Sequence, residues 1–179
     1  MTVMLVKPHL RFKESYNNYI NELADEERYP LTMEFDHTNF ESFLNKLRDY
    51  EKGKSLEEGH VANITYWLVE GNEIIGASNL RLKLNEQIEY CGGHIGLGIR
   101  PSKRGQNFGS KLLELTIQEA WKLGLTELHI HCYKSNLASA KTIQANNGRL
   151  HSEITLNQVV QRYVVNLSLI HISEPTRPY

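Results

Sequence analysis

Apolar positions repeat with a helical period in the first third of the chain and with a strand-like period after it. Up to residue 60, apolar side chains recur every three or four residues over 9–24 and over 40–50. This spacing predicts two amphipathic helices, the second capped by Thr38 or Asn39. The stretch 25–36 between them is acidic and contains aromatic residues and a proline, which indicates a connecting loop.

Strand signals dominate the rest of the chain. Runs that are β-branched, aromatic or alternately apolar and polar are separated by short turns such as Gly71-Asn72. Two more helices are predicted over 108–123 and 136–146, and a turn over 85–89. This order predicts an α/β (α+β) fold, with a mixed, mostly antiparallel central sheet of about seven strands and about four flanking helices. The predicted strands are 3–6, 64–70, 73–84, 91–99, 128–133, 150–156 and 159–166.

Length, charge and cysteine content narrow the class of protein. A chain of 179 residues can bury one full core, and we expect a single domain over 1–166. The net charge of −1 gives no field that would attract nucleic acid. We expect no membrane association and no secretion signal, because no apolar run approaches the ~20 residues that span a bilayer. Cys91 and Cys132 lack the spacing of metal ligands, which favours buried free thiols in a cytoplasmic protein.

The end of the chain is considered separately. Residues 167–177 read LSLIHISEPTR, which resembles the translation of an adapter used in sequencing libraries. We therefore expect 167–179 to be a non-native tail and give His171 and Glu174 no functional weight. A natural tail is the alternative.

The stretch 92–120 carries the clearest chemical signal, because an apolar strand leads through a proline-broken basic loop into an amphipathic helix. No carboxylate occurs between Glu89 and Glu114. Free main-chain N–H groups and the helix dipole make such a loop a site for anions, so a phosphate-bearing ligand is predicted at 104–110. The order Gly109-Ser110-Lys111 does not fit a Walker loop, and the glycines upstream lack the dinucleotide spacing. The basic residues gathered here are Arg100, Lys103, Arg104 and Lys111.

The segment RGQNFG, residues 104–109, followed by a helix, a strand and the Asn-x-x-Ser of Asn136 and Ser139, resembles the GNAT superfamily of N-acetyltransferases. The resemblance covers nearly the whole natural chain and is strongest to a little-characterised group of predicted bacterial acetyltransferases. It implies acetyl-CoA as cosubstrate, with its pyrophosphate on the amides of 105–110 and its pantetheine arm between splayed strands 91–99 and 128–133. The residues implied to bind it are Ile99, Arg100, Arg104, Gly105, Gln106, Asn107, Phe108, Gly109, Ser110, Asn136 and Ser139.

Two positions depart from the superfamily pattern. Asn107 replaces the middle glycine of the pyrophosphate motif Gln/Arg-x-x-Gly-x-Gly/Ala. Asparagine tolerates a left-handed φ best among the other residues, so we expect the loop geometry to persist. Ile143 stands where relatives often carry the tyrosine that protonates the leaving thiolate. Tyr133, at the end of a predicted strand, is the candidate replacement, and an ordinary half-buried aromatic is the alternative for it.

The acceptor amine must lose a proton, which calls for a base. His94 stands where the resemblance places a glutamate, in a His-Ile-Gly context, and imidazole titrates in the useful range. A structural histidine is the alternative. Glu89 is the second candidate base, with a solvated turn residue as its alternative. A main-chain N–H near Ile99, exposed by a bulge, would meet the thioester oxyanion.

The implied activity is transfer of acetyl to a primary amine of a small molecule or peptide, and association of two copies is left open. Ile143 and Asn107 suggest the alternative of a catalytically silent acyl-CoA-binding module. His129 and His131 share one strand face, but no third ligand accompanies them, so no metal site is predicted. The acidic stretch 25–36 would lie beside the opening through which the acceptor amine enters, or it would be a plain solvated loop. Its carboxylates are Glu26, Glu27, Glu34 and Asp36.

Overall fold

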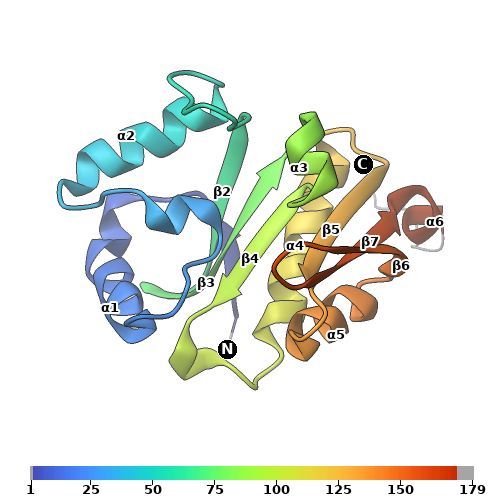
Figure 1. The fold of residues 1–179 in the computed structure, drawn as a ribbon. Helices are drawn as coiled ribbons and strands as arrows, with labels where there is room; N and C mark the ends of the chain where they lie inside the picture. Colours follow the sequence, from blue (N-terminus) through green and yellow to red (C-terminus); the bar gives the residue numbers. More distant parts are fainter. Residues whose placement is uncertain (1, 173–179) are drawn as a thin grey trace.

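Seven strands form two antiparallel sheets that lie side by side (Figure 1). The structure, a computed structural model, describes residues 2–172. One sheet has the order β1-β2-β3-β4 and the other β5-β7-β6. The predicted fold class is therefore confirmed, and the sheet parts between β4 and β5, where the splay was expected. The strands are β1 (Met4–Val6), β2 (Asn63–Glu70), β3 (Glu73–Arg81), β4 (Ile95–Ile99), β5 (Glu127–Tyr133), β6 (Arg149–Thr155) and β7 (Val159–Asn166).

Helices cover both faces of the first sheet. Its strand β2 is buried on both sides, because successive side chains of a strand point to opposite faces. Trp67 and Val69 pack with α1 and α2, whereas Ile64 and Tyr66 pack in the core that contains α4. None of the helices within 2–172 is both long and apolar enough to cross a membrane. The helices are α1 (Lys13–Leu23), α2 (Phe40–Glu51), α3 (Glu86–Tyr90), α4 (Phe108–Lys122), α5 (Leu137–Ala145) and α6 (Leu167–Ile172), with 3-10 turns at Leu10–Phe12, Leu31–Glu34 and Pro101–Lys103.

The segment from 82 to 94 differs from its predicted form. The strand predicted over 73–84 ends at Arg81, and the predicted turn contains α3, whose first amides are capped by the Asn85 side chain. The strand predicted to begin at Cys91 begins at Ile95. Its start is displaced because Gly93 has φ +73° and crosses β5 so closely that a Cβ there would lie 2.3 Å from the His129 carbonyl oxygen.

The first residues of the predicted tail form α6. Leu167 is fully buried, and its N–H donates to the Thr126 carbonyl oxygen at 2.8 Å. Burial of one leucine does not distinguish a native from a foreign segment, so the non-native origin of 167–179 stays a prediction. Residues 173–179 of that tail lie outside the described residues.

Candidate active site between the two sheets

The gap between β4 and β5 exposes main-chain donors of β4. On its other edge β4 pairs with β3, and the Arg100 N–H donates to the Ile75 carbonyl oxygen at 2.9 Å. Because main-chain groups of successive residues point to opposite sides of a strand, the N–H groups of Leu97 and Ile99 point away from β3 toward the gap. The β3–β4 register is unbroken, so the bulge expected near Ile99 is absent and is not needed to present its N–H.

The loop before α4 has the geometry of an anion site. Asn39, Asn85 and Asn136 each cap a helix by accepting a main-chain N–H bond three residues further on. Asn107 instead lies in the left-handed region, with φ 65° and ψ 17°, and its side chain makes no capping bond. The amides of 108–110 therefore keep their donors for a ligand, and the first turn of α4 has no acidic residue to compete. The expectation that Asn107 adopts the left-handed conformation is confirmed.

A partly buried ion pair joins the strand end before this loop to α1. Arg100, a residue that is 8% exposed, donates through Nε to the Glu22 carboxylate, which also accepts the Ser102 N–H at 2.9 Å. Burial works to raise the pKa of Glu22, but the bonds from Ser102 and Arg100 outweigh it and lower the pKa below its usual value. The Arg100 side chain is thus engaged inside the fold, and its main-chain N–H and carbonyl are bonded to Ile75 and Lys103, so the geometry favours a structural role over the predicted cofactor contact.

Arg104 is also engaged. Its guanidinium forms a fork with the Glu26 carboxylate at 2.7 and 3.3 Å, and its Nε donates to the Ile99 carbonyl oxygen at 3.1 Å. These bonds tie the predicted phosphate loop to the acidic connection and to the end of β4. Arg104 therefore shapes the loop.

The C-terminal end of α5 lies against the start of α4. Buried Asn146 donates through Nδ2 to the main-chain oxygens of Ser110 and Thr142, at 3.2 and 3.1 Å. At Gly109 a Cβ would lie 3.3 Å from the Thr142 hydroxyl, so glycine at this motif position lets the two helices approach closely. Asn146 and Thr142 were missed by sequence reasoning because only the packing of α4 on α5 gives them a role.

A pocket of about 360 Å³ occupies the gap. Its walls come from the connection 27–34, the start of β4, the end of β5 and the inner face of α5. The predicted residues Tyr133, Asn136 and Ser139 line it, and so does Ile143, where relatives often carry tyrosine. The connection reaches β4 directly, since a Cβ at Gly98 would lie 2.6 Å from the Tyr29 carbonyl oxygen. The acidic connection thus lies beside the pocket.

Neither predicted base faces this pocket. His94 is not among its lining residues, and its Nδ1 accepts the His129 N–H at 2.9 Å. That bond occupies the one lone pair of a neutral imidazole, so His94 has no acceptor left for a proton. Burial lowers the pKa of His94 to about 4. Glu89 is an exposed residue of α3 away from the pocket lining. The geometry therefore favours the structural alternative for both.

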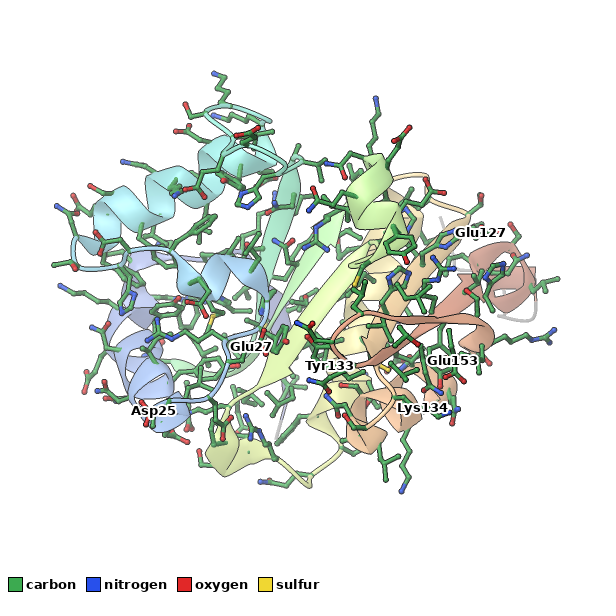
Figure 2. The ribbon with its side chains drawn as sticks, in the orientation of Figure 1. Asp25, Glu27, Glu127, Tyr133, Lys134 and Glu153 are labelled. Carbon is green, nitrogen blue, oxygen red and sulfur yellow. The ribbon has the colours of Figure 1, made fainter. Side chains whose placement is uncertain are left out.

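Tyr133 and the acidic connection meet at the pocket. Figure 2 shows Tyr133 and Glu27 pointing toward one another from β5 and from the connection before Pro30. Between them lies Tyr29, whose pKa is raised by burial and by hydrogen bonding to Glu27 and Tyr133. The Glu27 carboxylate and the Tyr29 and Tyr133 phenols thus form one cluster at the pocket. Sequence reasoning found Tyr133, but it did not single out Tyr29.

The histidines of β5 have partners of their own. His129 Nε2 lies 3.0 Å from the Glu127 carboxylate, and His131 Nδ1 accepts the Gly92 N–H at 2.9 Å. Over residues 2–172, no three His, Cys, Asp or Glu side chains gather closely enough to hold a metal ion. Both cysteines are free and line the pocket, and burial raises the pKa of the Cys132 thiol to about 11.

Residues 18–148, more than half of the chain, match the family model described as the acetyltransferase (GNAT) family. The chain belongs to this family. The resemblance drawn from the phosphate loop and the Asn-x-x-Ser helix is thereby confirmed at the level of the family. No curated protein matches this chain significantly in a sequence search.

Solved structures share the fold over nearly the whole of this chain. An acetyl transferase from Salmonella typhimurium that modifies the N-terminal serine of ribosomal protein L7/L12 is 16% identical, with a TM-score of 0.66 over 93% of this chain and 95% of that one. Mutant forms of the spermidine/spermine N-acetyltransferase SpeG from Vibrio cholerae are 15% identical, with a TM-score of 0.64 over 97% and 100%. RimJ from Mycobacterium smegmatis, in complex with CoA-disulfide, is 11% identical, with a TM-score of 0.70 over 94% and 83%. At these identities the likeness shows the fold alone.

Proposed function

We propose that the protein is an N-acetyltransferase that moves the acetyl group of acetyl-CoA to a primary amine of a small molecule or peptide by direct attack. The observation that carries the proposal is an uncapped α4 N-terminus beside a pocket that β4 lines at Leu97; the pocket-lining Thr142 lies against Gly109 of that N-terminus. The first feature suits a pyrophosphate, and the second suits a pantetheine arm and a thioester oxygen. Family membership and the CoA-bound relatives of the same fold support this cosubstrate.

The proposed cofactor contacts follow from the geometry. The amides of residues 105–110 receive the pyrophosphate, and Asn136 and Ser139 face the pantetheine arm from the pocket wall. The main-chain N–H groups of Leu97 and Ile99 stabilise the oxyanion that forms when the amine attacks the thioester carbon. Arg100 and Arg104 act by holding the loop.

Proton transfer is assigned to the cluster beside β4. As the amine nitrogen bonds to the acetyl carbon and the carbon–sulfur bond breaks, the Tyr133 hydroxyl gives its proton to the departing thiolate. Glu27 holds the incoming ammonium and takes one of its protons through water before attack; the second proton, which the nitrogen loses once it is bonded to the acetyl carbon, replaces the one that Tyr133 gave up. Ile143 cannot take part, because an aliphatic side chain offers neither donor nor acceptor. In this proposal Glu27 takes the role first predicted for His94 or Glu89.

The test combines binding and turnover. Calorimetry measures acetyl-CoA affinity, and thiol release with a panel of amines measures activity. Tyr133→Phe is expected to lower kcat by ~10²-fold or more, the contribution of a general acid, while the KM for acetyl-CoA changes little. Tyr90→Phe, an exposed tyrosine outside the pocket lining, is the matched control. A Tyr133→Phe variant as fast as this control would reject Tyr133 as the acid.

A silent acyl-CoA-binding module is the second candidate, favoured by the aliphatic Ile143 on the pocket wall. Binding of acetyl-CoA without turnover on any amine would support that function and contradict the enzyme. If neither acetyl-CoA nor CoA binds, both candidates are wrong.

A further inference from the structure

The end of the pocket remote from the phosphate loop holds a partly buried cation. Arg81 ends β3 and lines the pocket, and its guanidinium donates to the Gly93 carbonyl oxygen at 2.9 Å. Within residues 2–172 that carbonyl is the one hydrogen-bond partner of its side chain, and no carboxylate forms an ion pair with it. Burial lowers the pKa of Arg81. Buried charges in proteins are normally paired, so this guanidinium has capacity for an anion.

A second donor lies beside it. The Nδ1 of His131 accepts the Gly92 N–H at 2.9 Å, which requires that the proton of the neutral ring be on Nε2. This Nε2 is buried on a pocket-lining residue and has no hydrogen-bond partner among the described residues. A buried donor without a partner costs free energy, and an acceptor atom of a ligand would remove that cost.

The charges around His131 are of one sign. Burial first, and then the charges of Arg162, His129, His94 and Arg81, lower the pKa of His131 to about 4. The ring is therefore neutral near pH 7, and so is His94; the permanent positive charges that act on His131 are those of Arg81 and Arg162. Such an end of a low-dielectric pocket attracts a negative group.

The opposite wall carries more negative than positive charge. Glu27, Arg28 and Glu34 line the pocket from the connection, near the tyrosines, so two carboxylates stand against one guanidinium. Along β4 the two ends are separated, since His94 pairs with Arg81 whereas Gly98 lies against Tyr29. Four residues of strand span about 13 Å, and the long side chains reach into that interval. The pocket is thus positive at one end and negative at the other.

We infer that the acceptor carries, several bonds from its primary amine, an anionic group of the carboxylate class, which binds to the Arg81 guanidinium and to the His131 Nε2–H. This inference rests on the proposed acetyl transfer and names the substrate class. The ammonium end faces Glu27, and the anionic end fixes the direction in which the acceptor enters. A polyamine such as spermidine would instead place a cation against Arg81.

The test uses acceptors that differ only in their charge at one end. β-Alanine, 4-aminobutyrate and 6-aminohexanoate are compared with their primary amides, by calorimetry and by thiol release. CoA or acetyl-CoA is kept saturating, so that the phosphate loop is occupied. At the best length the free acid is expected to bind at least ~10-fold more tightly than its amide. Amides or spermidine that bind as well as the acids would overturn the inference.

Variants locate the site. Arg81→Gln is expected to reduce the acid-to-amide ratio to near one, whereas Lys83→Gln removes an exposed positive charge two residues away and should leave the ratio unchanged. A ratio that Arg81→Gln does not lower would place the anion elsewhere and refute the site. If Arg81→Gln does not fold, the acid-to-amide ratio of His131→Phe and that of the wild-type protein still test the anion site.

The two proposals fail differently. Acid-selective binding without turnover on any amine would refute the acetyltransferase activity and keep the anion site. Turnover of amines with no preference for acids would keep the activity and refute the anion site.

Discussion

Replacing Glu22 by glutamine tests whether the phosphate loop depends on α1. The side chain of Arg100 is only 10% exposed, and Glu22 is its nearest carboxylate, with Glu73 next at 3.5 Å. Removing one partner of a fully buried ion pair costs about 3–5 kcal/mol. The Glu22 side chain is 28% exposed, and glutamine can still accept from Arg100 and Ser102. We therefore expect a smaller loss of about 1–2 kcal/mol, typical of a charge-assisted hydrogen bond.

The assay is urea unfolding of Glu22→Gln beside Glu14→Gln, the same change at an exposed site in the same helix. A loss of 1–2 kcal/mol in a chain of this size lowers Tm by roughly 2–8 °C. Because the ion pair of Arg100 with Glu22 also positions the loop amides, the affinity of Glu22→Gln for acetyl-CoA should fall several-fold. Glu14→Gln should change neither property appreciably.

The pH dependence gives an independent check. The pKa of Glu22 is lowered in the folded protein, so its contribution is present above the unfolded value near 4.5 and disappears as pH falls through the folded value. The difference in unfolding free energy between wild type and Glu22→Gln should therefore shrink as the pH falls below about 4.5. Equal stability of the two glutamine variants at pH 7, or a difference that is the same at pH 3.5, would refute the reasoning.

Three further outcomes follow from the site. Asn107→Leu should lower the free energy of unfolding by about 1–2 kcal/mol and weaken CoA binding, because φ is +65° at this position. Asn107→Gly should keep both the stability and the CoA affinity. Calorimetry and thermal melting compare the two variants, and a Leu variant as stable as wild type would contradict the left-handed geometry. Cys132, with its pKa near 11, should react slowly with a disulfide reagent at pH 8 in a Cys91→Ser background, and rapid labelling of the folded protein would disprove its burial. His94 and His131 both have folded pKa values of about 4 against 6.5 unfolded, so their contribution to stability is fully present above pH 6.5 and is lost as the pH falls toward 4. His131→Gln should therefore reduce the slope of the unfolding free energy against pH between these values. An unchanged slope would show that His131 is not a source of the pH dependence.

Local signals in the sequence were sufficient for the elements and for the cofactor loop. Helical spacing located α2 and placed its cap at Thr38 or Asn39, of which Asn39 is the cap in the structure. Alternation located β5, and the run of β-branched and aromatic residues located β2, which is buried on both faces. The segment 104–110 could be found because a run of contiguous amides is sufficient to form an anion site. The same local reasoning placed strands over 82–84 and 91–94, where close passage of Gly93 over β5 decides the conformation.

Tertiary structure alone decided which side chains face the pocket. The sequence suggested His94 for chemistry and gave His131 no role, yet His131 lines the pocket and His94 does not, since His94 is bonded to the main chain of β5. Glu27 and Arg81 are 54 residues apart in the sequence, and the sheet brings them to one cavity. The sequence by itself determined the family and the phosphate loop, because both depend on neighbours along the chain. The part of the pocket that is proposed to bind the acceptor depends on contacts between elements that are distant in the sequence, and these contacts exist only when the chain is folded.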